Sequence, residues 1–140
     1  MARNPKRPLS PHLSIPYRWG PHMLVSILHR ATGSALAIGG GVLLVWWLIA
    51  LAGGAASYAR FVDLMTSDST GKLNLIPAVI LIGLTWSFLQ HLCSGIRHLL
   101  LDTGAGYELK VNKAGALATL AVSVVLTVLI WTLLLGKGAL

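Results

Sequence analysis

Three long apolar stretches without a charged side chain dominate the pattern along the chain. Their charge-free gaps hold 29, 24 and 23 residues, and about 20 apolar residues are enough to cross the hydrocarbon core of a bilayer as a helix. The pattern therefore predicts three transmembrane helices, over residues 25–52, 74–101 and 114–136. The gaps lie between Arg30 and Arg60, between Lys72 and Arg97, and between Lys113 and Lys137.

The fold class that follows is an all-α membrane protein. A lone open sheet would leave unpaired backbone groups in lipid, which excludes spanning strands. The composition agrees, because 55% of the 140 residues are hydrophobic and only 11% are charged. We expect residues 25–136 to form one transmembrane domain and the basic, proline-rich residues 1–24 to form an interfacial arm. Three short-looped helices are a thin scaffold for a pocket, so a partner subunit is also expected.

The net charge of +7 describes topology and does not indicate nucleic acid as a partner. Eight of the eleven Lys and Arg residues fall on the side of the N-terminus and the second loop. Cytoplasmic segments carry such an excess of cations, so the N-terminus is predicted to lie in the cytoplasm or an equivalent compartment. The eight are Arg3, Lys6, Arg7, Arg18, Arg30, Arg97, Lys110 and Lys113.

Polar side chains of the first two spans converge at this same side of the membrane. The first predicted helix runs outward and the second runs back, so the start of one and the end of the other share a leaflet. Ionisable groups inside a span are costly and usually mark a functional site. The converging residues are Ser26, His29, Arg30, His91, Arg97, His98 and Asp102.

His91 is the strongest single candidate among them. It lies one to two turns deeper than the charged end, which is too deep for easy contact with headgroups, so it fits a metal ligand or a proton relay. Gly95, four residues on, removes a side chain from the surface beside it. A haem iron needs a neutral imidazole, and the haem propionates need cations nearer the water. His91 together with His29, Arg30, Arg97 and His98 supplies that combination. Standing alone, His29 and His98 would more often be headgroup contacts.

The segments "RPLSPHLSI", "SILHRATG" and "HLCSGIRHLLLD" resemble the two signatures of the cytochrome b subunit of succinate dehydrogenase, the succinate:quinone oxidoreductase of respiratory complex II. The resemblance implies that His91 is an axial ligand of the haem b iron and that Ser26 and Arg30 belong to the ubiquinone site. It also implies that His29 and Arg30 lie near the haem propionates, with His98 a further possible contact. Gln90 and Leu101 depart from the residues that are common in the family at those positions.

The function implied by this resemblance is that of a membrane anchor, which forms half of a heterodimeric haem-binding bundle. A second small anchor subunit would supply the other haem ligand. An iron–sulfur subunit and a flavoprotein would hold the iron–sulfur centres and the flavin, so the chain alone would not oxidise succinate. The basic start, with few residues before the first motif, favours a bacterial inner membrane over an imported mitochondrial precursor.

Three other functions fit the same residues. The chain could be a structural anchor without a redox group, or an electron carrier in which His29 and His91 are both haem ligands and no quinone binds. A proton or ion pathway could also use these histidines.

Overall fold

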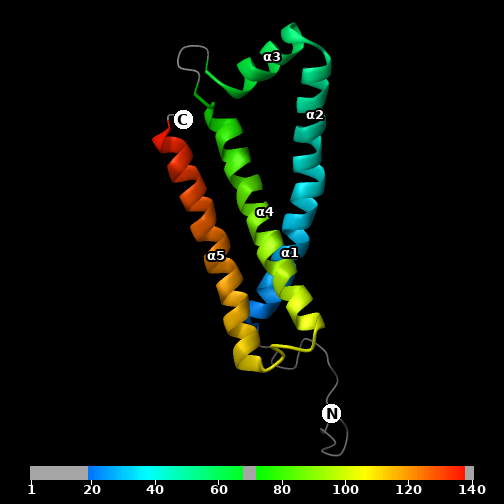
Figure 1. The fold of residues 1–140 in the computed structure, drawn as a ribbon, viewed down its shortest axis with the longest axis vertical. Coiled ribbons are helices and arrows are strands. Elements are labelled where there is room, and N and C mark those ends of the chain that lie inside the picture. The colour runs from blue at the N-terminus through cyan, green and yellow to red at the C-terminus, as the bar shows by residue number, and fades with distance from the viewer. Residues whose placement is uncertain (1–18, 68–71, 138–140) are drawn as a thin grey trace, which may run out of the picture.

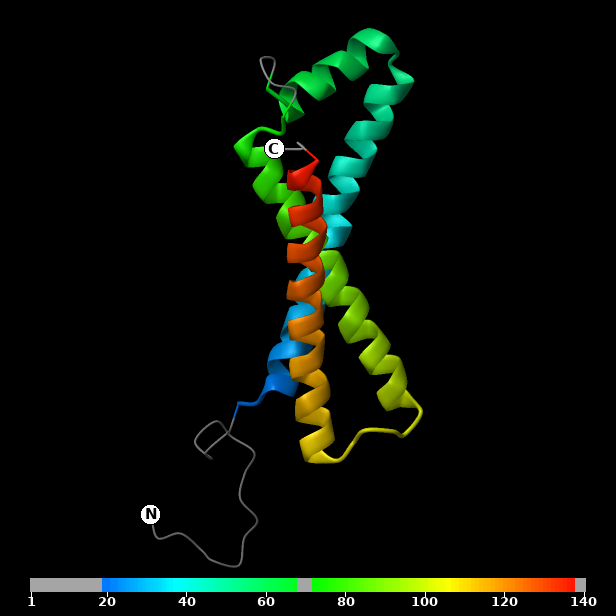
Figure 2. The same cartoon turned by 60° about the vertical axis from the view of Figure 1, so that its left-hand side comes forward.

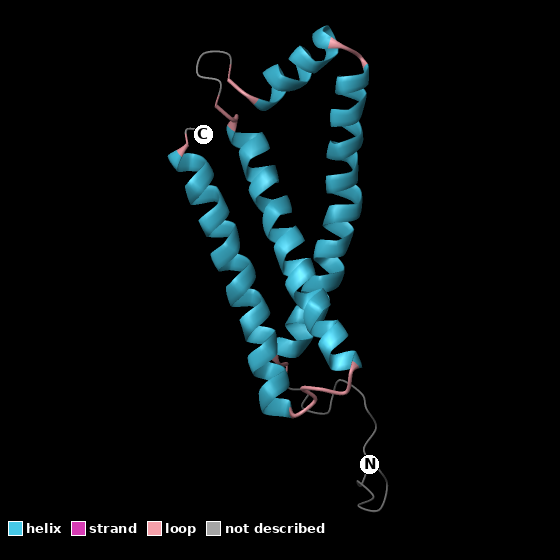
Figure 3. Ribbon diagram, in the orientation of Figure 1, coloured by secondary structure: helices cyan, strands magenta, loops and turns pink. Residues whose placement is uncertain are grey.

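A computed structural model describes residues 19–67 and 72–137, and these residues fold as helices joined by loops (Figure 3). Three helices of this part of the chain are long and apolar enough to cross a membrane. They run over Pro21–Ala52, Leu75–Asp102 and Leu109–Gly136, which confirms the all-helical class and the three predicted spans. The first and third begin four and five residues earlier than expected. Most of the interfacial arm predicted over residues 1–24 lies outside the described residues.

The first span is built from three segments: α1 (Pro21–Ala35), the π-helical segment η1 (Leu36–Gly40) and α2 (Gly41–Ala52). Helix α1 starts at Pro21, whose ring fixes the backbone torsion that a first helical position needs. The π segment widens the helix in mid-span, and such segments are frequent at functional sites. The wider turn also rotates every later side chain of this span about the helix axis, because it contains about one extra residue.

A short helix, α3 (Ala55–Met65), joins the first span to α4 (Leu75–Asp102). Gly54 precedes α3 with φ of 78°, a left-handed backbone conformation that glycine adopts without strain. The rings of Trp46 and Phe61 meet edge to face at 4.8 Å, which holds α3 against α2. Figure 1 shows α3 bridging the gap between the diverging ends of α2 and α4.

Helices α4 and α5 (Leu109–Gly136) pack along a seam of small and polar residues. Small side chains let the two backbones approach closely, and hydroxyl groups satisfy their own helix carbonyls in the absence of water. Most large apolar side chains instead point outward, as expected of a surface that faces lipid or another subunit. The buried residues of α4 are Ala78, Ser87, Leu89, Gln90 and Ser94, and those of α5 are Ala116, Thr119, Ser123, Thr127 and Trp131. Gln90 and Ser123 bond to each other across the contact between the two helices.

The beginning of α1, the end of α4 and the beginning of α5 meet at one end of the bundle (Figure 1). In the view turned by 60°, α5 runs along the front while the first span and α4 cross behind it (Figure 2). The polar residues at the start of the first span and those at the end of the second therefore lie at the same end of the bundle, as predicted. This end is opposite the one that carries α3.

Candidate functional site

A pocket of about 300 Å³ opens where α1, α4 and α5 meet. It is more polar than four other pockets on the described part of the chain, which are larger but are lined almost entirely by apolar side chains. Five residues singled out from the sequence line it together: Ser26, His29, Arg30, Arg97 and His98. The other polar residues of its wall are His22, Ser94 and Asn112.

His91 lies directly behind this pocket, stacked on His29. The two imidazole rings are nearly parallel, with an interplanar angle of 8° and centroids 3.9 Å apart. His91 Nδ1 lies 3.0 Å from the backbone carbonyl oxygen of His29 and 3.4 Å from Thr32 Oγ1. Because a carbonyl only accepts, His91 Nδ1 must carry the proton and donate it. The Nε2 lone pair of His91 is then left for another ligand.

The hydrogen bonds of Ser94 determine which ring nitrogen of His29 carries a proton. Its Oγ lies 2.7 Å from the backbone carbonyl oxygen of Gln90 and 2.7 Å from His29 Nδ1. The single hydroxyl hydrogen goes to the carbonyl, which cannot donate, so His29 Nδ1–H donates to the Ser94 oxygen. Both stacked histidines therefore keep Nε2 as an acceptor. The sequence pattern did not single out Ser94 for this role.

Gly33, rather than Gly95, makes the space that the His91 ring occupies. A methyl group added at Gly33 would come within 2.8 Å of His91 Cε1, which is closer than real side chains approach. A methyl group at Gly95 would instead meet His29 Cε1, at an ordinary contact distance of 3.7 Å. The close approach of α1 to the His91 ring thus depends on Gly33, and the expectation that Gly95 clears the surface of α4 beside His91 stays a prediction.

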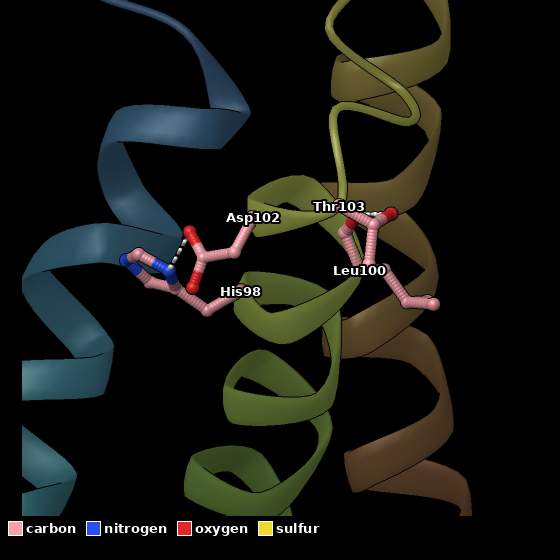
Figure 4. Close-up of polar contacts among 4 residues, drawn as sticks. All are labelled: His98, Leu100, Asp102 and Thr103. Atoms are coloured by element: carbon pink, nitrogen blue, oxygen red, sulfur yellow. Dashed lines mark hydrogen bonds and ion pairs between the residues drawn. The ribbon is translucent and has the colours of Figure 1, made fainter.

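Arg97 and Asp102 do not pair with each other. Arg97 donates through its guanidinium to the side-chain oxygen of Asn112 on α5, which ties the end of α4 to the beginning of the next span. Asp102 faces His98 across 3.6 Å (Figure 4), and both side chains are more than 60% exposed. An exposed pair of this kind contributes little to stability. The His98 ring lies 6.5 Å from that of His29, at the rim of the pocket.

Gln90 is the buried polar residue that sequence reasoning left without a role. Its side chain is completely buried, and Ser123 Oγ on α5, also completely buried, bonds to its Oε1 at 2.7 Å. Its Nε2 is buried without a hydrogen-bond partner. The signal was present in the sequence as Thr119, Ser123 and Thr127, spaced four apart on one face of an otherwise apolar span. A partner for Gln90 on that face was the natural inference.

The fold and this pocket together define a class of protein. It is an all-helical membrane protein with three spans, in which histidines and arginines gather around a polar pocket at one end of the bundle.

Comparison with known proteins identifies the family. A model of the succinate dehydrogenase/fumarate reductase transmembrane subunit matches residues 3–130, and the chain belongs to this family. It is 36% identical over 126 residues to the succinate dehydrogenase cytochrome b556 subunit of Rickettsia felis, covering 90% of this chain and 91% of that one.

Two further relatives extend the comparison. The cytochrome b556 subunit of Paracoccus denitrificans is 39% identical over 123 residues, which cover 88% of each chain. The mitochondrial cytochrome b560 subunit of Bos taurus is 35% identical over 125 residues, covering 87% of this chain and 68% of that one. The family resemblance found in the sequence motifs is thus confirmed, and it extends well beyond the motifs.

Proposed function

We propose that this chain is the membrane anchor and cytochrome b subunit of a succinate dehydrogenase. It would bind haem b through His91 together with a second anchor subunit, and it would form part of the site at which ubiquinone is reduced with electrons from succinate. The observation that carries the proposal is the shared pocket. Ser26, His29 and Arg30 line one cavity, and the ring of His29 lies face to face with His91.

The donor set around His91 fits a haem. Its Nδ1–H donates to the backbone carbonyl oxygen of His29. Such a bond fixes the tautomer and makes Nε2 a better metal ligand. No group of three or more His, Cys, Asp or Glu side chains that could hold a metal ion was found within residues 19–67 and 72–137. A metal at His91 would therefore need most of its ligands from elsewhere, as the iron of a porphyrin does. The bound haem would supply a one-electron carrier.

The second axial ligand would come from the partner anchor. His29 and His91 are stacked face to face with 3.9 Å between their centroids, and Nδ1 of each ring is already bonded within the chain. This arrangement favours one iron ligand from this chain over an electron carrier that uses both histidines. His29 and Arg30 are better suited to the propionates at the pocket side, with His98 at its rim as a further possible contact.

Ser26 and Arg30 suit a quinone. They lie four residues apart on one face of α1, and both line the pocket. The Ser26 hydroxyl would donate to a quinone carbonyl oxygen, and the Arg30 guanidinium would favour the negative charge that develops there on reduction. A hydrogen bond to a charged group is worth about 1.5–3 kcal/mol. That is similar to the roughly 2.5–3.5 kcal/mol that placing an arginine within a span costs, so a ligand would help to keep Arg30 in place.

The remaining subunits and the membrane follow from the same assignment. Succinate would be oxidised in a flavoprotein, and electrons would reach the pocket through an iron–sulfur subunit, so this chain is a non-flavin subunit of the enzyme. The cations that gather at the pocket end favour a cytoplasmic position for that end and for the N-terminus. We place the complex in a bacterial inner membrane. The exposed apolar side chains of the three spans would face lipid and the second anchor.

The test is a ratio of two activities in the assembled complex. Ser26→Ala and Arg30→Leu should lower succinate-dependent ubiquinone reduction strongly, the arginine change more so. Electron transfer from succinate to an artificial dye should continue, because the dye takes electrons in the soluble subunits, upstream of the membrane pocket. If both variants reduced ubiquinone at the wild-type rate, the quinone role of this helix face would be wrong. A purified complex without a b-type absorption band would favour a purely structural anchor.

A further inference from the structure

Gln90 and His91 are neighbours in α4, and their side chains bond to two different helices. Ser123 Oγ on α5 donates to Gln90 Oε1 at 2.7 Å, whereas His91 Nδ1 lies 3.0 Å from the backbone carbonyl oxygen of His29 on α1. Successive side chains of an α-helix are about 100° apart around the helix axis. The two bonds therefore hold α4 from two directions at the level of the proposed haem ligand.

The bond of Gln90 is the one that can fix the rotation of α4 at this level. Within residues 19–67 and 72–137, the side-chain hydrogen bonds between α4 and α5 involve Gln90 and Arg97. Arg97 bonds to Asn112 near the end of α4, seven residues and therefore about two turns away from Gln90. The contact between Gln90 and Ser123 thus acts where His91 leaves the helix.

A buried amide is an unfavourable way to join two helices. The side chains of Gln90 and Ser123 are completely buried, and Gln90 Nε2 has no hydrogen-bond partner, which costs free energy. Thr119 and Thr127 on α5 are also buried but bond to carbonyl oxygens of their own helix, so a polar residue at this contact does not need a partner on α4. Unfavourable choices of this kind are expected chiefly at functional sites.

The rotation of α4 acts directly on the bonding of His91. Its Nδ1–H donates to the His29 carbonyl oxygen, and its ring is stacked on that of His29 with centroids 3.9 Å apart. Rotation of α4 carries the His91 ring sideways and lengthens this hydrogen bond. A histidine whose second nitrogen loses its acceptor is a less basic metal ligand. The rotation of α4 therefore controls both the direction and the basicity of His91 Nε2.

We infer that Gln90 is a positioning residue of the haem site, which holds His91 in the orientation of an iron ligand through the bond to Ser123. This inference rests on the proposed function, in which His91 binds haem b. The Gln90 amide is bonded to α5, so it acts through the rotation of α4. Because a more basic ligand favours ferric over ferrous iron, loss of this bond should raise the midpoint potential of the haem.

The experiment is a redox titration of the haem in the purified, assembled complex. Gln90→Leu removes the bond from α4, and Ser123→Ala removes it from α5 with a smaller change, which keeps the test open if Gln90→Leu does not assemble. We expect each variant to bind ferric haem about tenfold less tightly relative to ferrous haem, which raises the midpoint potential by about 59 mV. The electron paramagnetic resonance signal of the ferric haem depends on the angle between the two axial ligand planes and should also change.

The double variant separates orientation from stability. When Gln90→Leu and Ser123→Ala are combined, no buried amide is left without its partner, so the apparent Tm should return toward that of the wild type. The midpoint potential should stay raised by the amount seen in each single variant, because all three lack the same bond. A potential that returned to the wild-type value together with the Tm would mean that Gln90 acts on stability alone.

Two further variants complete the test. Thr119→Val removes a buried hydroxyl from α5 that is bonded within its own helix, and it should leave the potential unchanged. An equal shift in Thr119→Val would overturn the inference. If His91→Ala loses the low-spin bands while Gln90→Leu and Ser123→Ala keep the wild-type potential, the inference fails and His91 remains the ligand. If His91→Ala leaves the spectrum unchanged, the proposed ligand itself is wrong.

Discussion

The imidazole rings of His29 and His91 lie face to face, with centroids 3.9 Å apart and an angle of 8° between the ring planes. One comes from the end of the first span that lines the polar pocket, and the other comes from the deeper part of α4. This stack joins the proposed quinone pocket to the proposed haem ligand. The contact depends on close packing of α1 against α4.

Gly33 is predicted to be essential for the position of the His91 ring. A methyl group there would come within 2.8 Å of His91 Cε1, so Gly33→Ala must displace the ring or the helix. Overpacking of this kind costs about 1–3 kcal/mol. We expect a lower apparent Tm of the purified complex and less haem per flavin. Gly39→Ala is the matched control, because its methyl group would meet only Leu84, at 3.6 Å. Equal behaviour of the two variants would refute the close contact at Gly33.

Ser94 is predicted to orient His29. Ser94→Ala removes the oxygen that accepts from His29 Nδ1, and a hydrogen bond at a partly buried position contributes about 0.5–1.5 kcal/mol. The free energy of unfolding should fall by that amount, and ubiquinone reduction should fall while dye reduction is kept. Thr103→Ala serves as the control, because its hydroxyl bonds to the Leu100 carbonyl at an exposed position (Figure 4). The idea is refuted if Ser94→Ala is as mild as Thr103→Ala.

The hydrogen bond between Ser123 and Gln90 is predicted to stabilise the packing of α4 against α5. Ser123→Ala would leave the completely buried amide of Gln90 without its partner, at a cost of about 1–3 kcal/mol. Adding Gln90→Leu should recover much of this loss, because replacing both partners by apolar groups removes the unpaired atom. The measurement is a double-mutant cycle on the apparent Tm of the complex. Thr132→Ala, at an exposed position of the same helix, is the control. Additive effects of the two changes would mean that the pair is not coupled.

The spans and their common polar end could be predicted from the sequence because they depend on one-dimensional features. Charge-free stretches fix where helices cross lipid, and alternating crossing directions fix that Ser26 and His91 share a leaflet. The partners of single side chains could not be predicted in this way. The π segment over Leu36–Gly40 and the crossing point at Gly33 depend on how the helices rotate against each other. The family motifs named Ser26, Arg30 and His91, but the contact of Gly33 with His91 and the bond between Ser94 and His29 emerged only from three-dimensional packing.

The most direct test of the account is the reduced-minus-oxidised optical spectrum of the purified complex with His91→Ala beside His98→Ala. An iron that loses one of two axial imidazoles changes its spin state and potential, so His91→Ala should abolish or distort the low-spin b-type bands even where the subunits still assemble. His98→Ala should keep the bands, with at most a shifted potential, because that side chain is exposed and paired with Asp102. An unchanged spectrum in His91→Ala, or complete loss of haem in His98→Ala, would contradict the assignment of His91 as the ligand.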